Sequence, residues 1–340
     1  MTIRLLFEGL ALLANTEERS LPLIVSPAEG CPALSDGRRE LIDCAERYLG
    51  EFGAILYRGF AEQSEREMQE FVAQFGVPLT SYDFASTPRT RLADGIYSST
   101  EYAREQHIPL HNEQSYTGRW PMKLWFFCVE VASRGGETPL ADSRRVYAAL
   151  SASVRHRLEQ RGLLYVRNYS PRLDVPWQKV FGTSDKAEVE AYCRRHAIEF
   201  EWRDGGTLRT RQRGPVLARH PKTGEVVWFN QAHLFHISAL DDELREGLLG
   251  LVGLEGLPRN VYYGDGSPLE EELLAEIRTT LAREQRVFQW RRGDVLLLDN
   301  MLVAHGRNPF SGQRRVLVSM AGLHEPSRPI RARDITWTQS

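Results

Sequence analysis

The chain has few cysteines and no long apolar run. Its 340 residues include four cysteines, with no C-x-x-C pair among them: Cys31, Cys44, Cys128 and Cys193. This spacing fits neither a zinc knuckle nor a disulfide framework, so we expect a reducing cytoplasmic setting. No stretch approaches the roughly 18 uncharged apolar residues of a membrane span. Glu8 interrupts the apolar segment at 5–13, and no small-x-small cleavage site follows, so we do not expect secretion.

An excess of charge of either sign is also lacking. The 43 Lys and Arg residues nearly balance the 45 Asp and Glu residues, which gives a formal net charge of -2. Nucleic acids and anionic membranes attract strongly basic surfaces, so we predict neither as a partner. With 42% hydrophobic and 26% charged residues, the composition is typical of a globular protein with a sizeable core.

No low-complexity tract, linker or internal repeat divides the chain, and we therefore expect one catalytic domain over residues 1–340. Apolar spacing predicts a helix at 36–52 and further helices that begin at Ser64, at Ser143 and at Ser267-Pro268. Runs rich in β-branched and aromatic residues predict strands at Ala54–Tyr57, Lys123–Val131, Leu163–Tyr169, Val226–Asn230, Val287–Trp290, Val295–Leu298 and Val316–Met320. These strands do not alternate regularly with helices, so the pattern favours a β-sandwich or barrel flanked by helices.

His111-Asn112-Glu113 is the strongest local signal. In extended backbone, residues i and i+2 project to the same face, so this segment can present an imidazole nitrogen and a carboxylate oxygen to one metal ion. That pair suits Fe(II), Mn(II) or Zn(II) better than Ca(II). Taken alone, however, H-x-E is more often a polar loop with a surface histidine.

A segment far downstream strengthens the prediction that His111 and Glu113 bind a metal ion. The predicted strand Val295–Leu298 leads into Asp299-Asn300 and then into His305-Gly306-Arg307. His305 would complete a face of two histidines and one carboxylate on a metal with open positions, which is typical of non-haem iron oxygenases. By itself, His305 fits a structural histidine better.

Such chemistry needs a dicarboxylate co-substrate with one end on the metal. Arginine pairs bidentately with a carboxylate, and Arg314-Arg315 opens the strand that follows His305. Side-chain alternation places one of the two arginines inward. We predict that Arg315 binds the distal carboxylate, with help from the hydroxyl of Thr138.

Together these blocks resemble the TauD/TfdA family of 2-oxoglutarate-dependent dioxygenases. The resemblance rests on H-x-E, G-G-E-T-P, G-D-V-L-L-L-D-N and H-G-R-x-P-F-x-x-x-R-R, which occur in this order. Weaker similarity reaches upstream through Tyr57-Arg58-Gly59-Phe60, so the catalytic core covers about residues 40–325. Several distant blocks in one order are far more specific than any one of them.

The resemblance implies a mainly β fold with flanking helices and a double-stranded β-helix, or jelly-roll, core. It also implies that His111, Glu113 and His305 bind Fe(II), and that Thr138 and Arg315 hold 2-oxoglutarate. Dioxygen would be the second co-substrate, and the reaction would hydroxylate an unactivated C–H bond.

Within the family, the chain is most similar to the syringomycin aspartyl-hydroxylase-like group. This narrower resemblance rests on the blocks 111–116, 135–142 and 227–233. It implies an amino acid or an amino-acid-derived substrate, free or tethered to a carrier protein, in the biosynthesis of a natural product such as an antibiotic.

Two departures from the family pattern bear on specificity. Glu113 replaces the usual Asp; it is still an oxygen ligand, whereas halogenating relatives have Ala or Gly there, so halogenation is not expected. Taurine-oxidising members carry an arginine four residues after the co-substrate arginine, where this chain has Ser319, so recognition of a sulfonate by that arginine is not expected either.

The substrate pocket is predicted from residues near the ligands and from an aromatic–amide block: Asn112, Gln114, Tyr116, Phe229, Asn230 and Gln231. A structural role is as good an explanation for each. A basic cluster could meet an acidic carrier protein, although a solvated charged face explains it better: Arg203, Arg209, Arg211 and Arg213. His233 and His236 are spaced for one helical turn, but we do not expect a second metal site.

Other classes stay open on the sequence alone. A desaturase or epoxidase needs the same ligands as a hydroxylase. A cupin-type isomerase or zinc hydrolase would keep the metal ligands but would not need Thr138 and Arg315. A degenerate binding protein on the same fold is disfavoured because all three ligand positions hold competent residues. The oligomeric state is not predicted.

Overall fold

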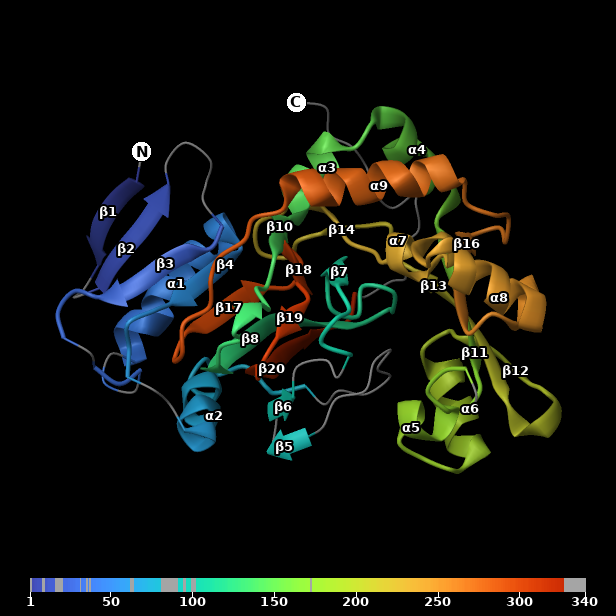
Figure 1. Ribbon diagram of the computed structural model, residues 1–340, viewed down its shortest axis with the longest axis horizontal. Coiled ribbons are helices and arrows are strands. Elements are labelled where there is room, and N and C mark those ends of the chain that lie inside the picture. Colours follow the sequence, from blue (N-terminus) through green and yellow to red (C-terminus); the bar gives the residue numbers. More distant parts are fainter. Residues whose placement is uncertain are drawn as a thin grey trace.

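The computed structural model describes residues 2–7, 10–15, 21–30, 32–34, 36, 38–61, 64–80, 91–93, 96–98, 102–171 and 173–326. At its centre a large sheet packs face to face against a small one, with helices on the outside (Figure 1). This arrangement confirms the prediction of a jelly-roll core with flanking helices.

The large sheet has the order β1-β2-β3-β4-β17-β8-β20-β6-β5 among the described residues. Its strands are β1 (Thr2–Phe7), β2 (Leu10–Asn15), β3 (Leu23–Pro27), β4 (Ala54–Tyr57), β17 (Val295–Asp299), β8 (Trp120–Glu130), β20 (Arg315–His324), β6 (Ile96–Ser98) and β5 (Arg91–Ala93). The described pairs are antiparallel except for β3 with β4. The predicted strands at 54–57, 123–131, 295–298 and 316–320 all lie in this sheet.

Both faces of the central strands are buried. In β20, Val316, Val318 and Met320 join the core between the two sheets, whereas Leu317 and Ala321 join the core under the N-terminal helices. A strand covered on both faces carries apolar residues at consecutive positions, not at alternate ones. For this reason the sequence pattern predicts the strands but does not show which face of each strand points toward the core between the two sheets.

Helices α1 (Arg38–Phe52) and α2 (Glu65–Ala73) cover the outer face of the large sheet. Both confirm predicted helices. Ser64 caps α2 in a capping box, because its hydroxyl accepts from the Glu67 amide while the Glu67 carboxylate accepts from the Ser64 amide.

The small sheet has the order β10-β18-β7 and carries three further helices on its outside. Its strands are β10 (Leu140–Asp142), β18 (Val303–Arg307) and β7 (Ile108–His111), and the helices are α3 (Ser143–Ala149), α4 (Ala152–Arg161) and α9 (Glu271–Glu284). Short pairs flank this region: β14 (Leu217–Arg219) with β15 (Val226–Trp228), and β9 (Arg134–Gly135) with β19 (Phe310–Ser311).

Three expectations about these elements are wrong. The helix expected from Ser143 is two helices, because Asp142 caps α3 and Ser151 caps α4. Ser267 does not open a helix; its amide donates to Asp265, and α9 begins at Glu271. Residues 287–290 are not a strand; the preceding Arg286 makes an isolated β-bridge with Leu140.

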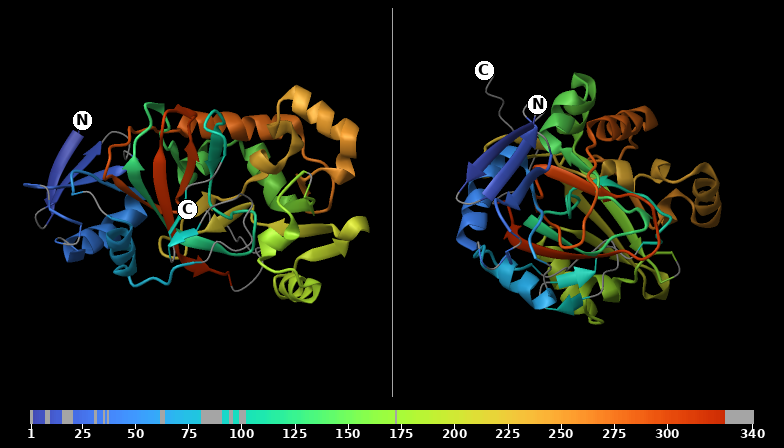
Figure 2. Two further views of the ribbon diagram at one scale, coloured as in Figure 1. Left: turned by 60° about the horizontal axis from the view of Figure 1, so that its bottom comes forward. Right: turned by 60° about the vertical axis from the view of Figure 1, so that its left-hand side comes forward.

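A third sheet extends the fold at the end opposite β1 and β2 (Figure 1; Figure 2, left). It has the order β12-β13-β11-β16, and β11 spans the predicted 163–169. The elements of this part are β11 (Leu163–Tyr169), α5 (Trp177–Phe181), α6 (Lys186–Arg195), β12 (Glu199–Trp202), η1 (Asp204–Gly206), β13 (Leu208–Gly214), α7 (Ala232–Phe235), η2 (Ile237–Ala239), α8 (Asp242–Val252), η3 (Leu254–Gly256) and β16 (Arg259–Tyr263). No helix of the described residues is long and apolar enough to cross a membrane.

The cysteines of the described residues give a test of this packing. Burial raises the pKa of Cys44 and of Cys128 to about 12, and that of Cys193 to about 11. Since the thiolate is the reactive form, these thiols are expected to resist an aromatic disulfide reagent at pH 8 in a Cys31→Ser background. All three should react once guanidinium chloride unfolds the chain. Fast labelling of any of them in the native protein would show that its thiol is exposed.

Candidate functional site

Two histidines far apart in the sequence lie opposite each other in the small sheet. His111 ends β7 and His305 lies in β18, and the two are directly paired in the antiparallel register. Their ring centroids are 4.6 Å apart. Gly306 permits this approach, because a Cβ there would lie 2.6 Å from the carbonyl oxygen of Ile108. The H-G-R motif therefore needs glycine for the pairing of β7 with β18.

Glu113 completes a three-ligand cluster. One ligand atom each from His111, Glu113 and His305 lies within 4.8 Å of the others. Glu113 and His305 are buried and His111 is partly buried. Two imidazole nitrogens and one carboxylate oxygen are suitable donors for Fe(II), so the residues present fit the predicted metal. The structure thus brings together all three residues predicted as ligands.

Neighbouring backbone groups orient the imidazoles. The Nδ1 atom of His111 lies 2.9 Å from the carbonyl oxygen of Pro109, which leaves Nε2 for a metal. The ring of Phe126 packs 5.1 Å from that of His305. His233 supports β7 through Nε2, 2.8 Å from the Leu110 carbonyl oxygen. Burial lowers the pKa of His233 to about 4, so this histidine is neutral at pH 7.

Asn300 holds Glu113 in place. Its Oδ1 accepts a hydrogen bond of 2.7 Å from the Glu113 amide, and its Nδ2 donates to the carbonyl oxygens of Glu113 and Pro121 at 3.0 and 2.8 Å. Asn300 is fully buried. The preceding Asp299 accepts from the amides of Met301 and Leu302. Asp299 and Asn300 of the G-D-V-L-L-L-D-N motif thus help to position the carboxylate ligand Glu113. The sequence had not predicted this role.

His111 and Glu113 face a cavity of about 560 Å³. Gln231 and Arg259 contribute polar groups to the wall, and His107 and Gln106 line it near β7. Most of the remaining wall is apolar and comes from α7, η2, α8 and the segment before β16: Leu234, Phe235, Ile237, Leu240, Leu244, Leu248, Leu257 and Pro258. A volume of this size accommodates a molecule larger than a single amino acid.

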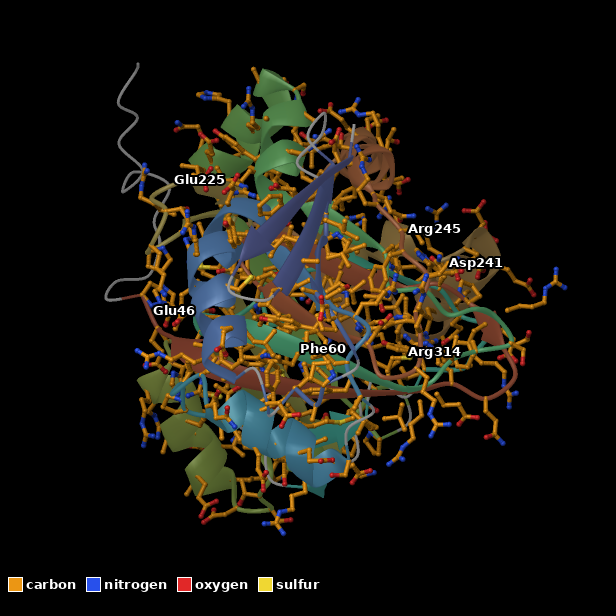
Figure 3. The ribbon with its side chains drawn as sticks, turned by 90° about the vertical axis from the view of Figure 1, so that its left-hand side faces the viewer. Glu46, Phe60, Glu225, Asp241, Arg245 and Arg314 are labelled. Atoms are coloured by element: carbon orange, nitrogen blue, oxygen red, sulfur yellow. The ribbon has the colours of Figure 1, made fainter. Side chains whose placement is uncertain are left out.

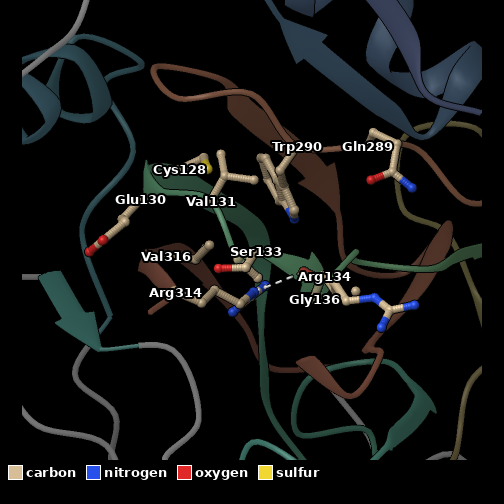
Figure 4. A pocket seen from close by; sticks show the side chains of 12 residues that line it. Cys128, Glu130, Val131, Ser133, Arg134, Gly136, Gln289, Trp290, Arg314 and Val316 are labelled. Carbon is tan, nitrogen blue, oxygen red and sulfur yellow. Dashed lines mark hydrogen bonds between the residues drawn. The ribbon is translucent and has the colours of Figure 1, made fainter. Parts of the chain in front are cut away.

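A second, smaller cavity of about 70 Å³ lies beside Arg314. Figure 4 shows Arg314 directed toward Gly136, to whose carbonyl oxygen its Nε donates at 2.8 Å. A side chain at Gly136 would place Cβ 2.9 Å from Cδ of Arg314, so the glycine turn makes room for this arginine. Trp290 lines the same cavity and donates its indole N–H to the Thr138 hydroxyl at 3.1 Å. Thr138 and Arg314 are therefore both adjacent to Trp290.

The prediction that Arg315 points inward is wrong. Arg315 shares the face of β20 that carries Leu317, and its guanidinium forms an ion pair with Glu65 at the start of α2. Its side chain is 47% exposed. Arg314, on the opposite face, is the inward arginine of the pair. Burial, and then the nearby charge of Arg307, lower the pKa of Arg314 to about 10, which still leaves it protonated at pH 7.

Most of the residues expected in the substrate pocket hold the core together. The Asn112 amide donates to Ser143 and to the Asn300 carbonyl, and the Asn230 amide donates to the Val216 carbonyl. Phe229 packs on Trp120, and Tyr116 packs on Tyr165 and Phe235. Gln114 is buried at a positive φ of 57° in the turn after Glu113.

Gln231 is the member of that set that lines the large cavity. Its Nε2 also donates to the Asn112 carbonyl at 2.7 Å. Amides in a core satisfy backbone carbonyls as readily as they bind a ligand, so the aromatic–amide block does not by itself identify cavity residues.

The basic cluster, for which contact with a carrier protein was the weaker explanation, is largely compensated within the chain. Arg209 pairs with Glu255, Arg203 and Arg211 both pair with Glu201, and Arg213 donates to the Gly264 carbonyl. The structure therefore favours the alternative of a partly neutralised surface. His233 and His236 have separate backbone and hydroxyl partners, Leu110 and Ser238, as expected for structural histidines.

Comparison with known proteins adds to this geometry. Residues 31–321 match the family described as "Taurine catabolism dioxygenase TauD, TfdA family". The chain belongs to this family. It is therefore a dioxygenase that depends on Fe(II) and 2-oxoglutarate, as the sequence motifs predicted.

Relatives of known name span most of the chain. The dapdiamide synthesis protein DdaC of Enterobacter agglomerans is 39% identical over 282 residues, which cover 83% of this chain and 86% of that protein. A clavaminate synthase-like protein of Arabidopsis thaliana is 31% identical over 323 residues, covering 89% and 94%. The crystal structure of PvcB from Pseudomonas aeruginosa superimposes with a TM-score of 0.57 at 16% identity, covering 94% of each chain, and shows the same fold. The narrower likeness to the syringomycin aspartyl-hydroxylase-like group stays a prediction.

The hydrogen bonds of Asn300 predict the effect of its removal. Asn300→Ala deletes three hydrogen bonds, two of them to the backbone of Glu113, so the affinity for Fe(II) should fall by about 10- to 100-fold. Anaerobic titration with Fe(II) or Co(II) measures this change. Asn168→Ala is the matched control, because Asn168 also donates to two backbone carbonyls, those of Glu255 and Leu257. Equal metal affinity in both variants would contradict the positioning role of Asn300.

Proposed function

We propose that the protein hydroxylates an amino acid or an amino-acid-derived small molecule in the biosynthesis of a natural product. The observation that carries this proposal is the cluster of His111, Glu113 and His305, of which His111 and Glu113 line the 560 Å³ cavity. The relative DdaC is named for dapdiamide synthesis, and PvcB is described as an oxygenase from an isonitrile synthetic pathway. Both names support a biosynthetic role.

His111, Glu113 and His305 would bind the metal and leave one side of it accessible. Fe(II) held in this way would supply the oxidising chemistry with 2-oxoglutarate and dioxygen. The chain itself orients its ligands through Pro109 and Asn300 and surrounds them with apolar side chains. Its contribution is therefore to hold the substrate carbon near the metal and to exclude water.

Arg314 is the better candidate for binding the distal carboxylate of 2-oxoglutarate. Its Nε donates to Gly136, while no described residue pairs with its two terminal nitrogens or offers it a carboxylate within 4.0 Å. A partly buried guanidinium without a counter-ion is destabilising unless an anion binds there. We keep Thr138 as the hydroxyl partner, because its hydroxyl accepts a hydrogen bond from Trp290, which lines the same cavity.

Desaturation and epoxidation use the same ligand set and stay as alternatives to hydroxylation. Membership of the family argues against a cupin-type isomerase, a zinc hydrolase or a degenerate binding protein. We further propose that residues 1–340 form one catalytic domain with its core at about 40–325, that it acts in the cytoplasm, and that neither nucleic acid nor membrane is a partner. The family match over 31–321 supports the single domain.

The metal and co-substrate can be tested together. The anaerobic protein with Fe(II) and 2-oxoglutarate is expected to show a weak visible metal-to-ligand charge-transfer band. His111→Ala, Glu113→Ala or His305→Ala should abolish the band and the turnover while leaving the thermal unfolding transition in place. A band of normal intensity in any folded variant would remove that residue from the metal site. Absence of the band in the wild type, with Fe(II) bound, would refute the proposed function.

Arg314 and Arg315 form a matched pair for the co-substrate assignment. Arg314→Gln should raise the 2-oxoglutarate concentration needed for half-maximal succinate formation by about 10- to 100-fold, because a charge-assisted contact is lost. Arg315→Gln removes only an exposed ion pair and should change it little. If Arg315→Gln raised this concentration more than Arg314→Gln did, Arg315 would be the residue that binds 2-oxoglutarate.

A further inference from the structure

Arg259 is a cation in the large cavity without an acidic partner in the part of the chain that the structure describes. It begins β16, is partly buried, and lines the same cavity as His111 and Glu113. Its guanidinium carbon lies 5.8 Å from the centroid of the Phe235 ring, which also lines the cavity. Among the residues that the structure describes, no carboxylate pairs with it. An arginine stacked on an aromatic ring keeps its planar edge available for a carboxylate.

A second arginine lies beside it. Arg167 of β11 is the direct register partner of Arg259, so the two side chains emerge on the same face of the sheet. Arg167 is buried and has Asp174 as its ion-pair partner, at 3.5 Å. The other carboxylate oxygen of Asp174 accepts from the Val175 amide, and one terminal nitrogen of Arg167 has no hydrogen-bond partner in the described part of the chain. Of these two neighbouring arginines, only Arg167 has a carboxylate partner among the described residues.

Two other titratable side chains of the cavity wall, Asp241 and His236, form no ion pair with Arg259 in the described part of the chain. Asp241 also lines the cavity, but its carboxylate accepts from the Leu244 amide as the N-cap of α8. Burial lowers the pKa of His236 to about 4, so this lining residue is neutral at pH 7. The guanidinium of Arg259 therefore remains available to pair with an anionic ligand.

Much of the remaining cavity wall is suited to contact with an apolar part of a substrate. The side chains between Arg259 and α8 are aliphatic or aromatic: Phe235, Ile237, Leu240, Leu244 and Leu248. Leu244 is 49% exposed in the structure, so a bound apolar group would cover surface that water now contacts. The cavity thus combines a cationic point, an apolar wall and, at His111 and Glu113, the metal ligands.

We propose that Arg259 binds a free carboxylate of the substrate, while the apolar part of the substrate lies against α7, η2 and α8. This proposal rests on the proposed function and narrows it. An aminoacyl group on a carrier protein has its α-carboxyl group consumed in the thioester bond. A carrier-tethered substrate would have only a side-chain carboxylate to offer Arg259, so the substrate favoured here is a free acid. The internal pairing of the basic cluster on β12 and β13 agrees with this choice.

The test compares acids with neutral molecules of the same shape. The probes are N-acetyl-L-alanine, N-acetyl-L-leucine and N-acetyl-L-phenylalanine, each with its primary amide, and binding is measured by calorimetry on the protein loaded with 2-oxoglutarate and Co(II). In the wild type, at least one acid is expected to bind about 10- to 100-fold more tightly than its amide. Arg259→Gln should remove that preference, and Arg259→Lys should retain part of it.

Arg245→Gln is the control variant. Arg245 lies in α8 and pairs with Asp242 and Glu271, and Figure 3 labels it next to Asp241 at the periphery of the molecule. It is not among the residues of the cavity wall, so this variant should keep the full preference for the acid. An arginine that only stacks on Phe235 would affect acid and amide equally.

The outcomes separate this inference from the proposed function. No preference for the acid in any pair, or an unchanged preference in Arg259→Gln, would overturn the carboxylate site even where the charge-transfer band forms. A preference that depends on Arg259 in a protein without the band would support the site and refute the iron-dependent function. Tight binding of carrier-bound aminoacyl thioesters, unaffected by Arg259→Gln, would overturn the choice of a free acid.

Discussion

The antiparallel pairing of β7 with β18 is the contact on which the rest of the site depends. It places His111 opposite His305, and it requires glycine at 306 because no side chain fits against the Ile108 carbonyl. Asn300 then connects the turn that carries Glu113 to the strand that precedes β18. The three ligand atoms converge because short-range hydrogen bonds join segments that are almost 200 residues apart in the chain.

The arginines to which we assign a ligand line a cavity and lack a described carboxylate partner, whereas the structural ones are paired within the chain. Arg58, Arg144 and Arg209 are paired with carboxylates of the chain and stabilise the fold. Arg314 and Arg259 face two different cavities, and neither has a carboxylate partner among the described residues. Partly buried cations of this kind are costly to the unliganded fold, which is why we assign an anionic ligand to each.

The short motifs of the sequence correspond to close contacts in the structure. In G-G-E-T-P, Gly136 makes room for Arg314, while Glu137 accepts from Gln289 and Asn308 and so ties the turn to its neighbours. In H-G-R, Arg307 donates to the carbonyls of Tyr102, Ala103 and Gln106 and fixes the segment that leads into β7. Much of each motif thus shapes the site without touching a ligand.

The sequence by itself predicted the fold class, most of the strands, the α1 and α2 helices and the three residues that the structure brings together as candidate metal ligands. Period and caps are local signals, whereas the ligands were predicted from several distant motifs that occur in the order typical of one family. Only the tertiary structure showed which of Arg314 and Arg315 faces inward. Both faces of β20 are buried, so its apolar residues follow one another without alternation and do not reveal which side faces the site. The same holds for the cavity wall. Whether an amide such as Asn112 or an arginine such as Arg259 meets the ligand depends on the partners that distant segments bring to it, and these partners are absent from any local pattern.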